Sequence, residues 1–238
     1  MWLAIDTATD RASVALGTGE ADAVEAEISG ARRHASALVP MIQELLSRRG
    51  VTLDAVRGVA LSDGPGSFTG LRVGASVAKA LVQTRGVELW TAPSLLVRAV
   101  GVAREDALVL AVSDALRGDV YAAAYRFTPA GVETMLPPTV RRPEVLAEET
   151  PRPDLLVGDA PTAIVEFLQR WAGGAMIRPP AGAPHARSLI GLTARSGGAT
   201  RVETVTSWEP VYGRPAEAQA RWEMTHGRPL PDSVGGSR

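Results

Sequence analysis

The chain lacks cysteine and is nearly without lysine. None of its 238 residues is a cysteine, and among 25 basic residues only Lys79 is a lysine. Disulfides, thiolate metal ligands and cysteine nucleophiles are therefore excluded. A mechanism that needs a lysine could use only Lys79, which falls within a predicted helix. The absence of cysteine is typical of cytoplasmic proteins, and we expect a cytoplasmic location.

The chain also has no large net charge and no long apolar run. The formal net charge is -1 and the isoelectric point is about 6.3, so nothing favours tight binding to nucleic acid or to an acidic membrane. The first residues, MWLAIDTATD, include no basic leader. No apolar run approaches the roughly 18 residues that span a membrane. We expect a soluble protein that binds no membrane and reaches RNA only through a partner.

Histidine is scarce, and the familiar catalytic motifs are missing. His34, His185 and His226 are far apart and form no H-x-x-x-H or H-E-x-x-H pair, so no zinc site is predicted. The segment GASVA around Ser76 is similar to a nucleophile elbow, which places its serine on a sharp turn between strand and helix. Ser76 lies inside a predicted helix instead, so we interpret it as a packing residue. We predict no catalytic residue and no metal ligand.

What is present is an alternation of strands and helices. Residues 2–6 and 11–17 predict a hairpin, and apolar residues at helical spacing then predict a helix that stops at Gly50. This helix begins either at a Ser36 cap or sooner, with a bend at Pro40. Another strand is predicted at 56–62, and the segment 87–101 predicts a strand followed by a helix.

A second series of elements begins after Gly101. Prolines at 137, 138 and 143 predict a link within it. Both halves mix sheet and helix, which predicts an α/β fold with domains at 1–101 and 102–225 and a disordered tail at 226–238. The predicted strands lie at 107–114, 119–127, 132–136 and 154–160, and the predicted helices lie at 161–173 and near 184–197.

The stretch LSDGPGSFTGLRVGASVAKAL, residues 61–81, could bind phosphate or could build a turn and a helix. A P-loop requires a lysine that is absent here, and Gly64, Gly66 and Gly70 miss the dinucleotide fingerprint by one residue. The alternatives are an anion site at a helix N-terminus or a tight turn made by Gly-Pro-Gly. Asp6 similarly predicts either a magnesium-bound phosphate or an Asx turn that closes the hairpin.

The helix after this turn carries a stripe of small residues, Gly70, Gly74 and Ala78, spaced four residues apart. Glycine costs a helix about 1 kcal/mol relative to alanine, so two glycines on one face indicate that another backbone approaches closely. That backbone belongs either to the protein's own sheet or first helix, or to a second chain. Spacing alone leaves both alternatives open.

Four segments together resemble the TsaB family: LAIDTATDRASVAL, HASALVPMIQELL, GPGSFTGLRVGASVAKAL and SDALRGDVYAAAY. The resemblance implies two ribonuclease-H-like lobes of the actin, sugar-kinase and heat-shock-chaperone (ASKHA) superfamily. It also implies a role in making threonylcarbamoyladenosine beside the anticodon of tRNAs that read codons beginning with A. In that family TsaD catalyses the transfer, TsaE supplies ATPase activity, and TsaB is a required partner that holds the assembly together.

The resemblance also implies roles for particular residues. The partner surface would pair with TsaD, or with a second copy of the chain when it is alone. No cofactor is bound tightly, ATP and magnesium are used by the assembled complex, and tRNA is reached only through it. The implied partner surface comprises Leu38, Val39, Ile42, Leu46, Gly70, Val73, Gly74, Val77, Ala78 and Leu81, and a vestigial nucleotide site comprises Asp6, Thr7, Gly64 and Gly66.

Two positions depart from the family pattern. Leu116 stands where the family usually has the arginine of Asp-Ala-Arg, and Gly213 stands where it tends to have the leucine of Tyr-Leu-Arg. Two other functions compete with the scaffold role. One is an active ATPase or kinase with Asp6 as magnesium anchor. The other is a peptidase, for which the sequence offers no nucleophile, base or metal set.

Overall fold

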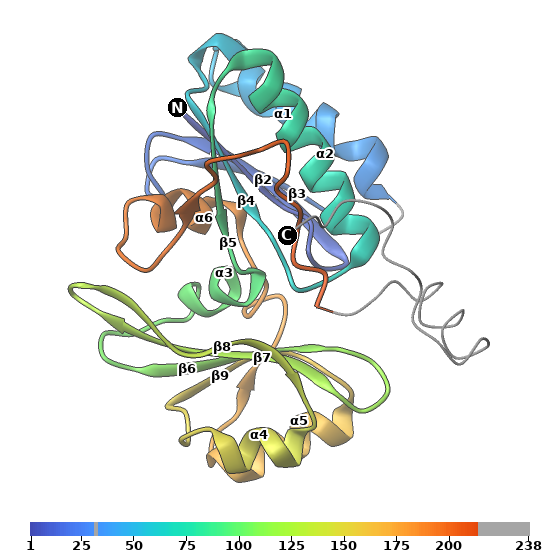
Figure 1. Ribbon diagram of the computed structural model, residues 1–238, viewed down its shortest axis with the longest axis vertical. Coiled ribbons are helices and arrows are strands. Elements are labelled where there is room, and N and C mark those ends of the chain that lie inside the picture. Colours follow the sequence, from blue (N-terminus) through green and yellow to red (C-terminus); the bar gives the residue numbers. More distant parts are fainter. Residues whose placement is uncertain (31–32, 214–238) are drawn as a thin grey trace.

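The computed structural model describes residues 1–30 and 33–213, which form two β-sheets with helices on both sides of each (Figure 1). The first sheet has the strand order β11-β5-β4-β1-β2-β3, and the second has the order β10-β9-β6-β7-β8. The strands of the first sheet are β1 (Trp2–Asp6), β2 (Arg11–Gly17), β3 (Val24–Ser29), β4 (Gly58–Ser62), β5 (Glu88–Ala92) and β11 (Thr200–Arg201). Those of the second are β6 (Leu108–Asp114), β7 (Val120–Thr128), β8 (Gly131–Arg141), β9 (Leu155–Asp159) and β10 (Met176–Ile177).

The two sheets share one topology. In the first sheet β1 pairs antiparallel with β2 and parallel with β4. In the second, β6 pairs antiparallel with β7 and parallel with β9. The next antiparallel strand is β3, beside β2, in the first sheet and β8, beside β7, in the second. The next parallel strand is β5, beside β4, in the first sheet and β10, beside β9, in the second. This repeated arrangement is that of two ribonuclease-H-like lobes, so the predicted ASKHA fold is confirmed.

The helices divide between the outside of the molecule and the space between the sheets. Helices α1 and α2 pack on the first sheet from outside, α4 and α5 lie outside the second sheet, and α3 and α6 lie between the two sheets (Figure 1). The helices are α1 (His34–Arg48), α2 (Phe68–Arg85), α3 (Ser94–Val100), α4 (Pro143–Glu149), α5 (Thr162–Ala172) and α6 (Ala186–Thr193), with a 3-10 turn, η2, at Leu53–Ala55.

Local chemistry explains where α1 and α2 begin and end. The Ser67 side chain accepts a hydrogen bond from the Gly70 amide at the start of α2, and Gly86 ends that helix with a left-handed φ of 66°. Helix α1 begins at His34, and Ser36 Oγ donates to the Arg33 carbonyl at 3.1 Å instead of capping the helix. Of the two predicted starts, the earlier one is confirmed, with Pro40 inside the helix.

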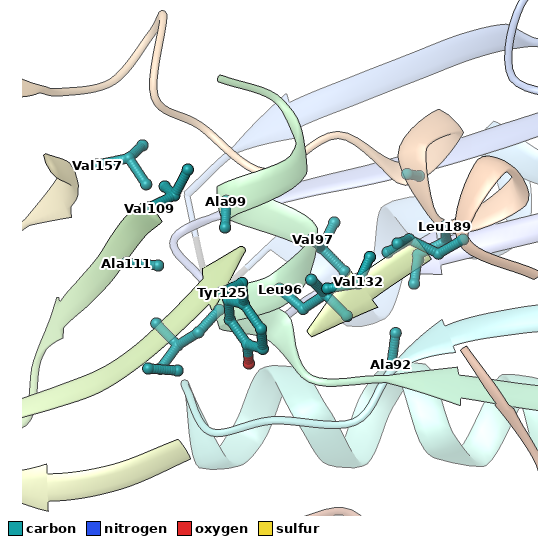
Figure 2. Packing of buried hydrophobic residues seen from close by; sticks show 14 of the residues in the cluster. Ala92, Leu96, Val97, Ala99, Val109, Ala111, Tyr125, Val132, Val157 and Leu189 are labelled. Atoms are coloured by element: carbon teal, nitrogen blue, oxygen red, sulfur yellow. The ribbon is translucent and has the colours of Figure 1, made fainter. Parts of the chain in front are cut away.

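A shared hydrophobic core fills the space between the sheets. It combines Ala4 and Ala60 of the first sheet with Val109 and Val157 of the second, and side chains of α3 and α6 lie between them. Figure 2 shows Leu96, Val97 and Ala99 of α3, Leu189 of α6 and Tyr125 of β7 in this core. The two lobes are therefore joined by packed side chains of one shared core.

The predicted proline link is wrong. Strand β8 runs through Pro137 and Pro138 to Arg141, and only Pro143 lies beyond it, at the start of α4. An edge strand tolerates proline because the missing N–H can face away from the sheet, and β8 is at an edge. Sequence patterns also missed β3, β10, β11 and α4.

The division of the chain into domains at residue 101 stays a prediction. The two sheets do not correspond to two continuous halves of the sequence. After the strands of the second sheet, α6 packs on the first sheet and β11 pairs with β5 of the first sheet. The predicted tail at 226–238 lies outside the described residues.

Candidate functional site

The small-residue stripe of α2 faces the protein's own first sheet. Gly70, Gly74 and Ala78 are buried. A Cβ atom added at Gly70 would lie closer than 3.0 Å to the Thr7 carbonyl oxygen, and one added at Gly74 would lie as close to Thr7 Oγ1. The backbone that approaches α2 is therefore the turn after β1. We correct the prediction that these three residues meet a partner, because the packing alternative explains both glycines.

The predicted surface on α1 is likewise mostly internal. Leu38, Ile42 and Leu46 are buried in the core under α1 and α2, so their apolar side chains are explained by packing within this chain. Val39, in contrast, is 48% exposed. The outward-facing residues of these helices include the charged Glu44, Arg48, Arg72 and Arg85. We call the small or uncharged residues that are at least partly exposed the α1–α2 face: Ser36, Val39, Pro40, Val73, Ser76, Val77, Ala80 and Leu81.

The glycine loop between β4 and α2 is covered by the chain's own backbone. A Cβ at Gly64 would meet the Val211 carbonyl oxygen, and one at Gly66 would meet that of Ala8, both closer than 3.0 Å. The Ser67 amide donates to the Ala8 carbonyl at 2.8 Å, and the Val211 amide donates to that of Asp63 at 2.7 Å. A phosphate at these two glycines would have to displace that backbone. The loop is therefore a tight turn, as the second alternative predicted.

Asp6 and Thr7 are completely buried at the end of β1. Asp6 Oδ1 accepts a hydrogen bond from the Ala8 amide at 3.2 Å, which is the predicted Asx turn. Asp6 Oδ2 and Thr7 Oγ1 have no hydrogen-bond partner. Burial raises the pKa of the Asp6 carboxyl, opposed by the nearby Ser62 hydroxyl and the Ala8 amide. In the described ranges, 1–30 and 33–213, no three His, Asp or Glu side chains are grouped to hold a metal ion.

Asp63 follows directly after β4 and is a second carboxyl with a shifted pKa. Burial raises its pKa to about 6, although a hydrogen bond with Thr91 acts in the opposite direction. Asp63 also affects a residue of the second lobe, Tyr125 on β7. Burial is the larger cause that raises the pKa of the Tyr125 hydroxyl, and the negative charge of Asp63 raises it further. Asp63 is not among the predicted site residues, since an acid in the loop SDGPG is typical of ordinary turns.

The Asp63→Asn variant tests this assignment. The folded protein keeps a proton on Asp63 up to a pH of about 6, whereas the ordinary pKa is 3.8. Between these values the folded state binds more protons, so its stability falls as the pH rises. We expect Asp63→Asn to raise the free energy of unfolding above this window by up to about 3 kcal/mol, and by much less below it. Denaturant titrations across pH measure the difference, and an equal effect at all pH values would contradict the shifted pKa.

The two departures from the family pattern occupy distinctive places. Leu116 is 54% exposed at the tip of the β6–β7 hairpin, where it and Arg117 have positive φ angles of 63° and 58°. Gly213, with φ of 74°, packs against the Tyr121 ring and Pro65, both closer than 3.0 Å to the position of a Cβ. A leucine at 213 would require the backbone around residue 213 to move away from Tyr121, so glycine is needed for this packing.

A groove that sequence analysis missed lies where β3 meets α6. Its volume is about 560 Å³. Its charges are largely paired across the two elements: Glu25 contacts His185 Nδ1 at 3.3 Å and Arg187 Nε at 2.9 Å, and Ser188 donates to Glu20 at 2.9 Å. These residues are about 160 positions apart in the sequence, so no local motif could reveal the groove. It is lined by Glu20, Glu25, Glu27, Val100, Gly101, His185, Arg187 and Ser188.

Comparisons with known proteins agree on one family. The family model described as TsaD, tRNA N6-adenosine threonylcarbamoyltransferase, matches residues 27–164. The "tRNA threonylcarbamoyladenosine biosynthesis protein TsaB" of Escherichia coli is 35% identical over 61% of this chain, a match that spans only 64% of that protein. The TsaB of Bacillus subtilis is 26% identical and covers 92% of this chain and 96% of its own length. The solved structure of YeaZ from Pseudomonas aeruginosa is 28% identical, with a TM-score of 0.72 over 89% of this chain and 98% of its own.

Among the described residues, none of the helices has the length and apolar character needed to cross a membrane.

Proposed function

Because the chain belongs to the TsaB family, we propose that it acts in the synthesis of threonylcarbamoyladenosine in tRNA as a non-catalytic subunit. A TsaD-type partner transfers the threonylcarbamoyl group to the adenosine beside the anticodon, in tRNAs that read codons beginning with A. TsaE, ATP and magnesium act in the assembled complex. The present chain provides a rigid body on which that partner is held, and it works in the cytoplasm.

The shared core between the lobes is the observation that carries this proposal. In a two-lobed fold a nucleotide or substrate needs an open space between the lobes. Here that space is occupied by apolar side chains of α3 and α6, including Leu96, Val97 and Leu189 (Figure 2). The glycine loop below it is covered by the backbone of Ala8 and Val211. Both features favour a supporting role over an ATPase or peptidase activity of this chain.

We assign partner binding to the α1–α2 face. Its side chains are small or uncharged, so a partner helix could approach them closely, although the charged Glu44 and Arg72 are exposed on the same helices. Both helices are anchored from below by the core that contains Leu38, Leu45 and Ala78, which keeps the face rigid. When no TsaD-type partner is present, the same face pairs two copies of this chain. The net charge of -1 gives the chain no strong attraction for phosphate, so tRNA is bound through the partner.

Reconstitution tests the proposed function. The isolated chain is expected to form no threonylcarbamoyladenosine on tRNA, because no catalytic group is assigned to it. Addition of TsaD, TsaE, the activated threonylcarbamoyl donor and ATP should give multiple turnover, and leaving out this chain should abolish it. Nucleoside mass spectrometry measures the product. Modified tRNA formed by this chain alone would contradict the scaffold role, and micromolar ATP binding that is lost in Asp6→Ala would favour the ATPase alternative.

A further inference from the structure

Lys79, the single lysine of the chain, is held by the segment that follows β11. Its ammonium binds Glu209 Oε1 at 2.7 Å and lies 5.7 Å from the centre of the Trp208 ring. A cation beside a carboxylate and over an aromatic face is attracted by both groups. The Lys79 side chain is 20% exposed. Lys79 therefore ties α2 to a segment that lies 130 positions later in the sequence.

This segment, residues 202–213, runs alongside α2 (Figure 1), and we call it the strap. At its start the Val202 amide donates a hydrogen bond to the Leu89 carbonyl of β5 at 2.8 Å. Val202, Val205 and Trp208 pack against the hydrophobic core under α1 and α2. The strap is thus fixed to the first lobe by apolar packing, by a backbone hydrogen bond and by its contacts with the lysine.

The far end of the strap lies against the glycine loop and the second lobe. The Tyr212 ring centre is 4.7 Å from that of Phe68 at the start of α2, and the Val211 amide donates to the Asp63 carbonyl at 2.7 Å. The Tyr121 hydroxyl of β7 lies 3.5 Å from the Tyr212 carbonyl oxygen. The strap therefore connects β5, α2, the glycine loop and the second sheet.

The strap borders the α1–α2 face. Ser76 of that face lies three positions before Lys79 on α2, and residues three apart on a helix are surface neighbours. A partner helix seated on Ser76 would therefore lie beside Lys79 and Glu209, whose side chain is 66% exposed. Water screens the attraction between exposed charges, so a partner that excludes water at this border strengthens the attraction between Lys79 and Glu209.

We propose that Lys79 is a positioning residue that keeps the strap closed on α2, and that the closed strap and a partner bound at the α1–α2 face stabilise each other. The second part rests on the proposed function, because it needs the TsaD-type partner. The first part concerns this chain alone. Coupling between two equilibria is reciprocal, so the factor by which the partner favours the closed strap is the factor by which strap closure favours partner binding.

Acetylation by an N-hydroxysuccinimide ester of acetic acid tests the first part in the isolated chain. Lys79 is the only side-chain amine, and peptide mass spectrometry separates it from the amine of Met1. Glu209→Gln should speed acetylation of Lys79 by about threefold, and Trp208→Ala, which also removes apolar packing, by roughly tenfold. Glu203→Gln is the matched control, because Glu203 is an exposed carboxylate on the same strap, and it should leave the rate unchanged.

Hydrogen exchange gives a readout that does not depend on amine reactivity. Lys79→Met removes the charge at a similar side-chain length, so the Val211 amide should exchange several-fold faster. Lys79→Arg keeps a cation between Trp208 and Glu209 and should preserve most of the protection. Circular dichroism should be the same for both variants. If the arginine and methionine variants exchange equally fast at Val211, or if Glu209→Gln and Trp208→Ala are acetylated no faster than the control, Lys79 does not hold the strap.

The second part is tested with the TsaD-type partner. Saturating partner should slow exchange of the Val211 amide, which lies at the far end of the strap, and Trp208→Ala should weaken partner binding in calorimetry while Glu203→Gln should not. Unchanged affinity of Trp208→Ala would overturn the coupling. If the unmodified chain binds no such partner, the proposed function fails, whereas the acetylation and exchange results still decide the role of Lys79.

Discussion

Replacement of Gly70 by alanine is expected to destabilise the whole protein severely, although alanine is the better helix former. The added methyl group would lie closer than 3.0 Å to the carbonyl oxygen of Thr7. That oxygen belongs to the backbone of a buried turn, so neither side can move without shifting β1 or α2. Overpacking of this kind costs about 3 kcal/mol or more, against a propensity gain of about 1 kcal/mol. The net loss corresponds to a melting temperature lower by roughly 4 to 8 °C, or to failure to fold.

Two other glycines calibrate this prediction. At Gly74 the methyl group would meet a rotatable group, Thr7 Oγ1, so Gly74→Ala should cost less than Gly70→Ala. The larger Gly74→Leu should lower the melting temperature rather than selectively remove a partner. Gly174 has nothing within 4 Å of a Cβ position, and Gly174→Ala should be neutral. Thermal denaturation measures all four variants. A Gly70→Ala protein as stable as Gly174→Ala would show that the stripe does not pack as described.

The stripe illustrates what the sequence can predict and what it cannot. Helical spacing correctly placed Gly70, Gly74 and Ala78 on one face and showed that a backbone approaches it. Spacing fixes which residues share a face, but the identity of the neighbour depends on tertiary packing. The same limit applies to Leu38 and Val39, which are adjacent in the sequence on α1, although Leu38 is buried and Val39 is exposed.

The central strands and helices of both lobes followed from local patterns because their apolar runs are long and are bounded by turns. The short elements β10 and β11, with two residues each, have too little pattern to be recognised. The charged groups between the lobes were missed for a different reason. Arg98, a buried residue of α3, lies in an apolar run and Asp63 in a turn, and their burial results from contacts between sheets that local sequence does not record.

Four residues of the predicted partner surface, Val39, Val73, Val77 and Leu81, remain at least partly exposed, and all four belong to the α1–α2 face. Val39 is its most exposed large apolar side chain, and Val73, Val77 and Leu81 are partly exposed beside it on α2. A TsaD-type partner that covers this face would exclude water from Val39. A carboxylate placed there would then be buried without a counter-ion, which costs several kcal/mol. Substitution at Val39 should therefore affect assembly far more than folding.

Val39→Glu is expected to weaken binding of the TsaD-type partner by roughly a hundredfold or more, because several kcal/mol of unpaired charge are added to the interface. Activity in the reconstituted reaction should fall in parallel, while circular dichroism and melting temperature stay close to those of the unmodified protein.

Val145→Glu is the matched control: Val145 is also an exposed valine on a helix, 37% exposed on α4 of the other lobe, and its substitution should leave binding intact. Size-exclusion chromatography and calorimetry measure the affinities. If Val39→Glu and Val145→Glu bind equally well, the interface lies elsewhere on the molecule, and the partner surface would have to be sought away from α1 and α2.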